Sequence, residues 1–307
     1  MTRDNRVVCE QVLQQVFKGE SKLVSLLQDK RNNIKLLACT CLTNLNRTGM
    51  LKESQCDVKS TVIPTLVGLF DNESIHAHKA PLILGYLIKD DSNLQKVAAD
   101  CGAIDKLAPY ITCPNPTKMK ENALICLASV CSLREDCRKM IIEASLLSAI
   151  VVGLQSPHEG IRAASCQCTR SLSRSVKALR TSLLEVEVDK HLFTLLEDPN
   201  PSVQVMATAI VCNIVLDFAP MKKSVLENGG IEKLIALVHS MDSTIRFNAV
   251  WAIKNLVYQA SSEIKQTVMR NLTFNVFDQL LHDSDNGVQE QAVNMLRNIA
   301  CNHILVM

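Results

Sequence analysis

Three close pairs of cysteine or histidine side chains are the residues of this sequence best suited to bind a metal ion. They are Cys39 and Cys41, Cys166 and Cys168, and His76 and His78. A structural zinc site needs four ligands that converge on one point, whereas residues two apart on a helix point about 200° apart. The sequence also contains no Cys-x-x-Cys pair. We therefore expect no metal site and no cofactor, and we assign these side chains to core packing.

Sequence patterns typical of enzymes are missing. The chain contains no His-Glu-x-x-His, no Gly-x-Ser-x-Gly, no Gly-x-x-x-x-Gly-Lys-Ser/Thr and no Gly-x-Gly-x-x-Gly, the patterns that place metal ligands, nucleophiles or phosphate cradles. Most of the seven histidines are scattered through polar corners, as His158, His239, His282 and His303 are. We expect no catalytic residues, no enzymatic activity and no small-molecule substrate.

Charge and hydropathy exclude two further classes of partner. The formal net charge of +2 gives no field strong enough to favour nucleic acid or an anionic membrane. The N-terminus leads into no apolar signal segment, and the longest apolar stretch, at residues 146–154, is too short to span a bilayer. We expect protein partners, and we expect the protein in the cytoplasm and nucleus.

The thirteen cysteines do not form a secreted disulfide framework. Their number is odd, and several fall at positions that we predict to face a helical core. These are Cys39, Cys126, Cys166 and Cys212. We expect them to be reduced, buried thiols.

Seven short segments repeat at a spacing of 42 or 43 residues, each around one small residue. We call these the anchor residues: Ala38, Ala80, Ala123, Ser165, Ala207, Ala249 and Ala292. Aliphatic residues follow each anchor at offset +7, and apolar residues precede it at offset −4, except at His76. On a helix these offsets fall within about 40° of each other. The pattern predicts seven helices, which we call the anchor helices, each with one buried stripe.

Two further helices accompany each anchor helix. A second apolar helix precedes it, as at residues 192–196 and 234–238, and a short third helix follows it, as at residues 221–227 before Gly229. A helical period of about 42 residues is typical of armadillo and HEAT repeats, and three helices per repeat favour armadillo. We predict an all-α, right-handed armadillo-repeat superhelix of about seven repeats. With no linker in the composition, residues 1–307 should form a single solenoid.

The face opposite the buried stripe should line a groove. Offset +6 carries a hydrogen-bonding side chain in every repeat: Asn44, Tyr86, Ser129, Ser171, Asn213, Asn255 and Asn298. Offset +2 carries the one tryptophan, Trp251. An amide can bind the backbone of an extended peptide, and an indole offers a flat apolar wall. The alternative is that the asparagines bridge neighbouring helices internally.

From this face we predict a partner-binding groove. Its residues are Asn213, Trp251, Lys254, Asn255, Asn294, Arg297 and Asn298. Lys254, Arg297 and the nearby Arg246 could take a carboxylate or an acidic partner segment. A second feature is a run with four basic residues among hydroxyls, Arg170, Arg174, Lys177 and Arg180. This run is either an anion-binding or phosphorylation patch or an exposed turn between helices.

Longer strings go beyond a generic repeat pattern. They are IRAA at 161–164, SLSRS at 171–175, LRTS at 179–182, CNIVLDFAP at 212–220, VLENGG at 225–230 and RFNAVWAIKN at 246–255. These strings resemble the armadillo repeat-containing protein 8 family, the armadillo subunits of GID/CTLH ubiquitin ligases. The resemblance is close over residues 161–301 and weaker before them. It implies a non-catalytic scaffold that holds an exchangeable substrate receptor in its groove and joins it, through scaffold subunits, to the catalytic core for proteasomal degradation.

The resemblance also predicts a fragment. Family members are longer at both ends, whereas this sequence begins within a repeat and ends directly after an anchor helix, with no polar cap at either end. We therefore expect an apolar flank that promotes self-association.

Two other peptide-binding classes remain as alternatives. An importin-alpha-like nuclear-import adaptor also pairs a Trp with an Asn four residues later, as Trp251 and Asn255 do, but it repeats this pair in several units. A catenin-like adaptor would need a basic groove, and offsets +2 and +6 contain no Lys or Arg.

Overall fold

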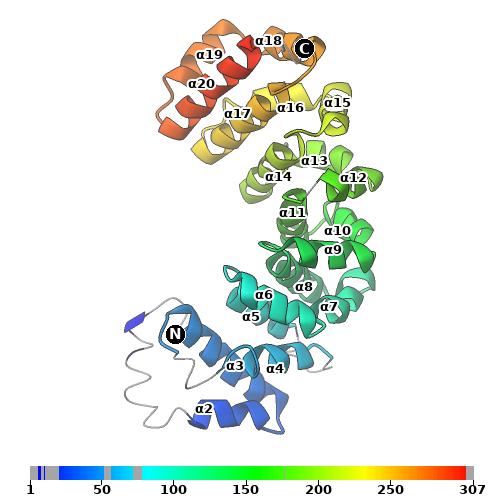
Figure 1. The fold of residues 1–307 in the computed structure, drawn as a ribbon, viewed down its shortest axis with the longest axis vertical. Helices are drawn as coiled ribbons and strands as arrows, with labels where there is room; N and C mark the ends of the chain where they lie inside the picture. The colour runs from blue at the N-terminus through cyan, green and yellow to red at the C-terminus, as the bar shows by residue number, and fades with distance from the viewer. Residues whose placement is uncertain are drawn as a thin grey trace, which may run out of the picture. The chain divides into compact units, whose positions relative to one another are not determined.

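The computed structural model describes residues 6–7, 10, 21–51, 57–71, 78–175 and 177–301. Its regular elements over these residues are helices, and this part of the chain contains no β-strand (Figure 1). The all-α prediction is therefore confirmed. The chain divides into two compact units, residues 1–150 and 151–307, and each is described separately below. A single solenoid over residues 1–307 stays a prediction.

Each of the seven anchor residues lies in its own helix. Unit 1 contains α3 (Asn32–Arg47), α5 (Lys79–Ile88) and α8 (Thr117–Val130), and unit 2 contains α11 (Glu159–Ser173), α14 (Pro201–Ile214), α17 (Ser243–Val257) and α20 (Asn286–Ala300). No anchor residue exposes more than 2% of its surface. In unit 2, α14 packs on α11, α17 on α14 and α20 on α17, side by side (Figure 1). The small anchor residues permit this close approach of helices.

The predicted second helix is present in all seven repeats, and the third helix is present in five of them within the described residues. The second helices are α2 with the 3₁₀ turn η1 (Ser21–Ser25, Leu26–Gln28), α4 (Val62–Gly68), α7 (Ala103–Thr112), α10 (Leu147–Gly153), α13 (Val188–Leu195), α16 (Gly230–Leu237) and α19 (Phe274–Leu281). The third helices are α6 (Ser92–Asp100), α9 (Glu135–Glu143), α12 (Lys177–Glu185), α15 (Ala219–Glu227) and α18 (Ser262–Asn271). Gly102 and Gly229 join third to second helices at φ +79° and +69°, angles that favour glycine.

The buried stripe follows the predicted offsets. At +7, the residues from Leu45 to Leu256 are buried and Ile299 is half-buried. At −4, the four residues of unit 2 are buried, whereas Ile34 and Met119 in unit 1 are half-buried. His76, which breaks the apolar rule, lies outside the described residues. In unit 2, where the predicted groove residues lie, the stripe is buried at every position except the half-buried Ile299.

The predicted core thiols are buried. Cys39, Cys126, Cys166 and Cys212 expose 0%, 0%, 0% and 3% of their surfaces. Burial raises the pKa of Cys166 and of Cys212 to about 12, because the thiolate loses its hydration. Cys41 is exposed while Cys39 is buried, so the assignment of Cys41 to core packing is wrong, whereas Cys166 and Cys168 are both buried.

The described residues contain neither a metal-binding cluster nor a membrane-spanning helix. They contain no group of three or more Cys, His, Asp or Glu side chains placed to share a metal ion. None of their helices is both long enough and apolar enough to cross a membrane.

Candidate binding groove on the anchor helices

Trp251 lies on the surface of α17, as predicted. Its side chain is 38% exposed. Phe247, one turn earlier on the helix, meets the indole edge to face, with ring centroids 5.4 Å apart. Lys254, one turn later, places its Nζ 5.4 Å from the indole centroid, within the range of a cation–π contact. Trp251 is therefore held between an aromatic ring and an ammonium group while one face stays open to a partner.

The prediction that Asn255 faces the surface is wrong. Asn255 is only 4% exposed, and its Nδ2 donates to the backbone oxygen of Cys212 at 2.9 Å. Asn298 is 6% exposed, and its Nδ2 donates to the backbone oxygen of Lys254 at 3.1 Å. The half-buried Asn213 donates to Ser173 Oγ at 2.9 Å.

These bonds support the alternative interpretation of the +6 asparagines. Each asparagine amide reaches an atom on the preceding anchor helix and bridges two repeats. Their positions on the helix were predicted correctly, but their amides point towards the preceding anchor helix. A role for these three asparagines in contacting a partner stays a prediction.

A column of cations at offset +5 was not found from the sequence. In unit 2 this offset holds Arg170, Cys212, Lys254 and Arg297. Arg170 and Lys254 both act electrostatically on the Cys212 thiol, and Arg297 acts on Lys254, so the side chains follow one another along the helices. These basic residues could have been found in the sequence, because offset +5 directly precedes the offset +6 at which we compared the repeats.

The three cations of this column form no ion pair within the described part of the chain. Arg170 Nε is buried without a hydrogen-bond partner among the described residues, and its Nη1 lies 3.9 Å from Met206 Sδ, a weak contact. Arg297 is exposed, with Nη2 3.2 Å from Asn298 Oδ1. Burial, assisted by the repulsion of Arg297, lowers the pKa of Lys254, while Glu290 opposes this shift. The column is electropositive.

Arg246 is not available to a partner carboxylate, contrary to our suggestion. Its Nε and Nη2 both donate to the carboxylate of Asp283 at 2.8 Å, and its Nη1 donates to the backbone oxygen of Ser240 at 2.9 Å. Arg162, at the same offset of −3, makes the matching bonds to Asp198. Both arginines do bind a carboxylate, but it belongs to an aspartate in the next corner of their own chain.

The structure therefore assigns the predicted groove residues to two groups. Trp251 and Arg297 are exposed, Lys254 and Asn294 are half-buried, and their contact with a partner stays a prediction. Asn213, Asn255 and Asn298 connect anchor helices to each other. All seven belong to unit 2, on α14, α17 and α20.

The basic run falls partly in α11 rather than in an exposed turn. Ser171, Ser173 and Ser175 are buried, with 7%, 1% and 4% exposed surface, so these hydroxyls are poor targets for phosphorylation. Arg170 belongs to the cation column. Val176 lies outside the described residues, as do the side chains of residues 177–180, which include Lys177 and Arg180.

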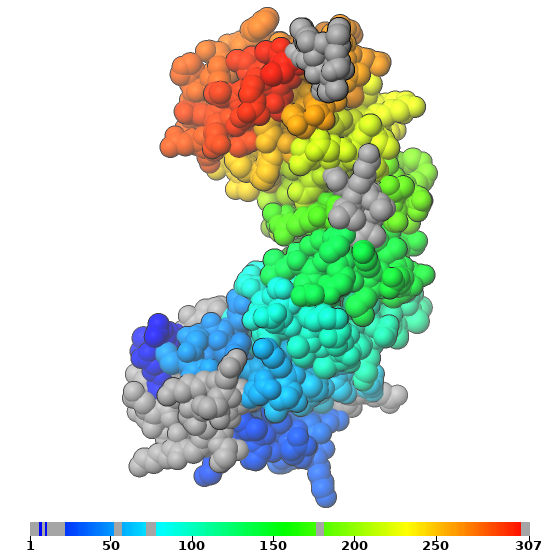
Figure 2. All heavy atoms as spheres, viewed as in Figure 1, coloured from blue at the N-terminus to red at the C-terminus, as the bar shows by residue number. Residues whose placement is uncertain are grey.

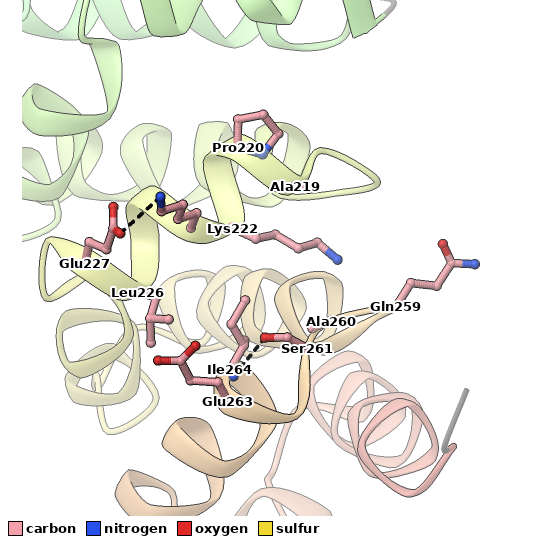
Figure 3. Close-up of a pocket in the computed structure, with 11 residues that line it drawn as sticks. Ala219, Pro220, Lys222, Leu226, Glu227, Gln259, Ala260, Ser261, Glu263 and Ile264 are labelled. Carbon is pink, nitrogen blue, oxygen red and sulfur yellow. Dashed lines mark hydrogen bonds and ion pairs between the residues drawn. The ribbon is translucent and has the colours of Figure 1, made fainter. Parts of the chain in front are cut away.

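A second hollow of unit 2 lies between the third helices α15 and α18 and has a volume of about 900 Å³ (Figure 3). Its lining carries both charges, and Lys223 pairs there with Glu227 at 3.5 Å. Lys222 is only 5% exposed and donates to the backbone oxygen of Tyr258. The lining contains no histidine or cysteine.

The armadillo/beta-catenin-like repeat family matches residues 219–258. This segment is one three-helix repeat, α15, α16 and α17. Curated relatives match far more of the chain. GID complex subunit 5 of Schizosaccharomyces pombe is 31% identical over 298 residues, covering 87% of this chain and 38% of the relative. Armadillo repeat-containing protein 8 of Danio rerio is 33% identical over 322 residues, covering 97% of this chain and 47% of the relative. The chain thus spans less than half the length of these relatives.

Solved structures agree on the fold. An engineered protein with 20% sequence identity superimposes with a TM-score of 0.84, covering 97% of this chain and 72% of that chain. A designed armadillo repeat protein in complex with the peptide (KR)4 is 19% identical and superimposes with a TM-score of 0.71, covering 77% of this chain and 99% of that chain. At these identities the likeness establishes the armadillo fold alone.

Proposed function

We propose that this chain, which belongs to the armadillo-repeat proteins and is homologous to armadillo repeat-containing protein 8 and GID complex subunit 5, is the armadillo subunit of a GID/CTLH-type E3 ubiquitin ligase. In this role it acts as a non-catalytic scaffold. Unit 2 holds a substrate receptor, and contacts with scaffold subunits connect the receptor to the catalytic core. The proposed location is the cytoplasm and nucleus.

The observation that carries this proposal is the exposed, supported Trp251 beside Lys254 on α17. Tryptophan is among the residues most often found at the energetic centre of a protein interface. The amphipathic indole contributes apolar contact, and the unpaired cations Lys254 and Arg297 contribute orientation. That armadillo repeats can hold peptides is supported by the designed protein in complex with (KR)4.

The cation column argues against the importin-alpha-like alternative. Such an adaptor binds basic localisation peptides, and Arg170, Lys254 and Arg297 would repel them. The Trp–Asn pair also occurs once rather than in successive repeats, and its asparagine is buried in the present case. An acidic or neutral segment suits this surface better than a basic one.

Co-purification of the 307-residue chain with GID/CTLH subunits tests the proposal. We expect association with scaffold subunits and with a substrate receptor. Trp251→Ala should weaken receptor binding by about 1–3 kcal/mol, or roughly five- to 150-fold, as for an interface hot spot. Phe274→Ala is the matched control, because Phe274 is 81% exposed on the second helix α19 and should leave binding unchanged.

Three results would oppose the proposal. The first is wild-type protein that captures no ligase subunit. The second is equal receptor binding by the Trp251→Ala and wild-type chains. The third is tight binding of a basic localisation peptide, which would favour the import-adaptor alternative.

A further inference from the structure

A separate groove of about 510 Å³ lies within unit 1, on three consecutive anchor helices. Helices α3, α5 and α8 each contribute to its walls. The lining residues are Asn33, Leu36, Leu37, Thr40, His78, Lys79, Leu82, Ile83, Lys118 and Asn122. None of them belongs to the groove proposed for the ligase receptor, which lies in unit 2. This unit 1 groove therefore needs its own explanation.

The walls of the unit 1 groove are mainly apolar and open to water. Leu37 is 61% exposed and Leu82 is 37% exposed. Leu37 lies at offset −1 of α3. The same offset holds the buried Asn122 on α8 and the buried Ala164 on α11 of unit 2. Leu82 is at offset +2, the same offset as Trp251. Two leucines exposed on adjacent anchor helices of one groove are typical of a binding surface rather than of a solvated face.

A buried amide in this groove lacks one hydrogen bond. Asn122 is 1% exposed, and its Nδ2 donates to the backbone oxygen of His78 at 2.7 Å. Its Oδ1 is buried without any donor from the described residues. A buried amide oxygen without a donor is unfavourable. A ligand N–H group that reaches this oxygen would supply the missing donor.

The charge of the unit 1 groove has one sign. Lys79 and Lys118 are part of the lining, and no aspartate or glutamate is. Lys118 pairs with Glu121 at 2.8 Å, but Lys79 forms no ion pair with a described residue. A second copy of this chain would bring lysines against lysines, so the groove is not complementary to itself. An occupant with a carboxylate fits it better.

We propose that the unit 1 groove binds a short extended segment of a partner protein, in which a large apolar side chain lies next to an aspartate or glutamate. The apolar side chain packs between Leu37 and Leu82. The carboxylate meets Lys79. A backbone N–H of the segment donates to Asn122 Oδ1. An extended peptide has backbone N–H groups free for such a bond, whereas a helix pairs them internally. The volume suits one or two large side chains together with their backbone.

A peptide array tests the proposal on the full 307-residue chain. The array contains hexapeptides in which Leu, Ile, Met, Phe or Trp is flanked by glutamates. Matched sets replace the apolar residue by Ser or the glutamates by lysines. We expect the wild-type chain to prefer the acidic–apolar set over both others by at least tenfold.

Two variants connect this preference to the groove. Leu82→Ser should weaken acidic–apolar binding at least tenfold, whereas Leu296→Ser, a similarly exposed leucine of unit 2, should not change it. Lys79→Glu should shift the preference towards the lysine-flanked set. Both changed residues are exposed, and thermal unfolding at the wild-type temperature would show that the variants fold.

Equal binding of all three peptide sets would overturn the proposal, as would binding that Leu82→Ser leaves unchanged. A dimer that Leu82→Ser abolishes, without peptide binding, would also overturn it by identifying a second copy as the occupant. The result is independent of the ligase function, because ligase capture is read out through Trp251 in unit 2.

Discussion

At the scale of single residues, the same side-chain type serves different purposes at neighbouring offsets of the anchor helices. Asn255 at +6 is buried and bridges to Cys212, whereas Asn294 at +2 is half-buried and its side chain forms no hydrogen bond with a described residue. Trp251 also lies at +2 and remains open to a partner. Offsets +2 and +6 are only four residues apart on the helix. The side chain at +6 is a structural amide, whereas the side chains at +2 belong to a surface that can bind a partner.

Replacing Asn255 by Ala should lower the free energy of unfolding by about 1–3 kcal/mol, because the buried oxygen of Cys212 loses its amide donor. Leu256→Ala should cost about 2–5 kcal/mol through lost volume between packed helices. Chemical unfolding of the full chain measures both. Asn294→Ala is the matched control and should change the free energy of unfolding by no more than about 0.5 kcal/mol. An Asn255→Ala chain as stable as the wild type would contradict the bridging role.

At the scale of elements, the corners between second helices and anchor helices are held by long side chains at offset −3. Arg162 and Arg246 each bind an aspartate of the next corner, 36 and 37 residues later. Gln204 and Gln289 occupy the same offset and donate to the backbone oxygens of Leu196 and Asp283 at 2.7 Å. Each anchor helix of unit 2 therefore fixes the corner that precedes it, and the arginines also fix the corner that follows.

Arg246→Met should lower the free energy of unfolding at neutral pH by about 1.5–3 kcal/mol, the range for hydrogen bonds to a charged group. Arg246 lowers the pKa of Asp283 below its ordinary value of 3.8. The folded state therefore holds its proton less tightly than the unfolded state, and the pair's contribution is complete above about pH 4 and is lost as the pH falls through the lowered pKa.

Unfolding of wild-type and Arg246→Met chains from pH 7 to pH 2 measures this effect. The difference in stability between them should be constant near neutral pH and should shrink in acid. A difference that persists undiminished to pH 2 would show that the ion pair is not its origin.

At the scale of the whole molecule, each of the two units is a stack in which an anchor helix packs on its neighbours in sequence. Figure 2 shows the surface of the chain coloured along the sequence, and successive repeats of unit 2 follow one another there. On α17, the residues at offsets +1 and +4 from the anchor are Val250 and Ile253. Both are fully buried because α20 packs against α17. In α20 the same offsets hold Val293 and Leu296, which are 57% and 44% exposed.

These two apolar side chains should make the 307-residue chain self-associate at high concentration, because apolar area exposed to water is worth about 25 cal/mol per Å² when buried. The double variant Val293→Lys, Leu296→Lys should remain monomeric under the same conditions. Light scattering over a concentration series measures the molar mass of both chains. A wild-type chain that stays monomeric throughout would contradict the expectation.

The sequence by itself determined the seven anchor helices, their buried stripe and the exposure of Trp251. These features depend on local periodicity and on small residues at a regular spacing, both of which can be read along the chain. Family resemblance likewise depended on local strings such as residues 246–255.

Only the tertiary structure decided which polar side chains are free to bind. Asn255 and Arg246 were predicted to meet a partner, but they meet Cys212 and Asp283, which lie 43 and 37 residues away in the sequence. The cation column and the apolar groove of unit 1 likewise arise from residues on different repeats. The offset of a residue fixes the direction in which it leaves its own helix. The helix that packs against it fixes whether it meets water or protein.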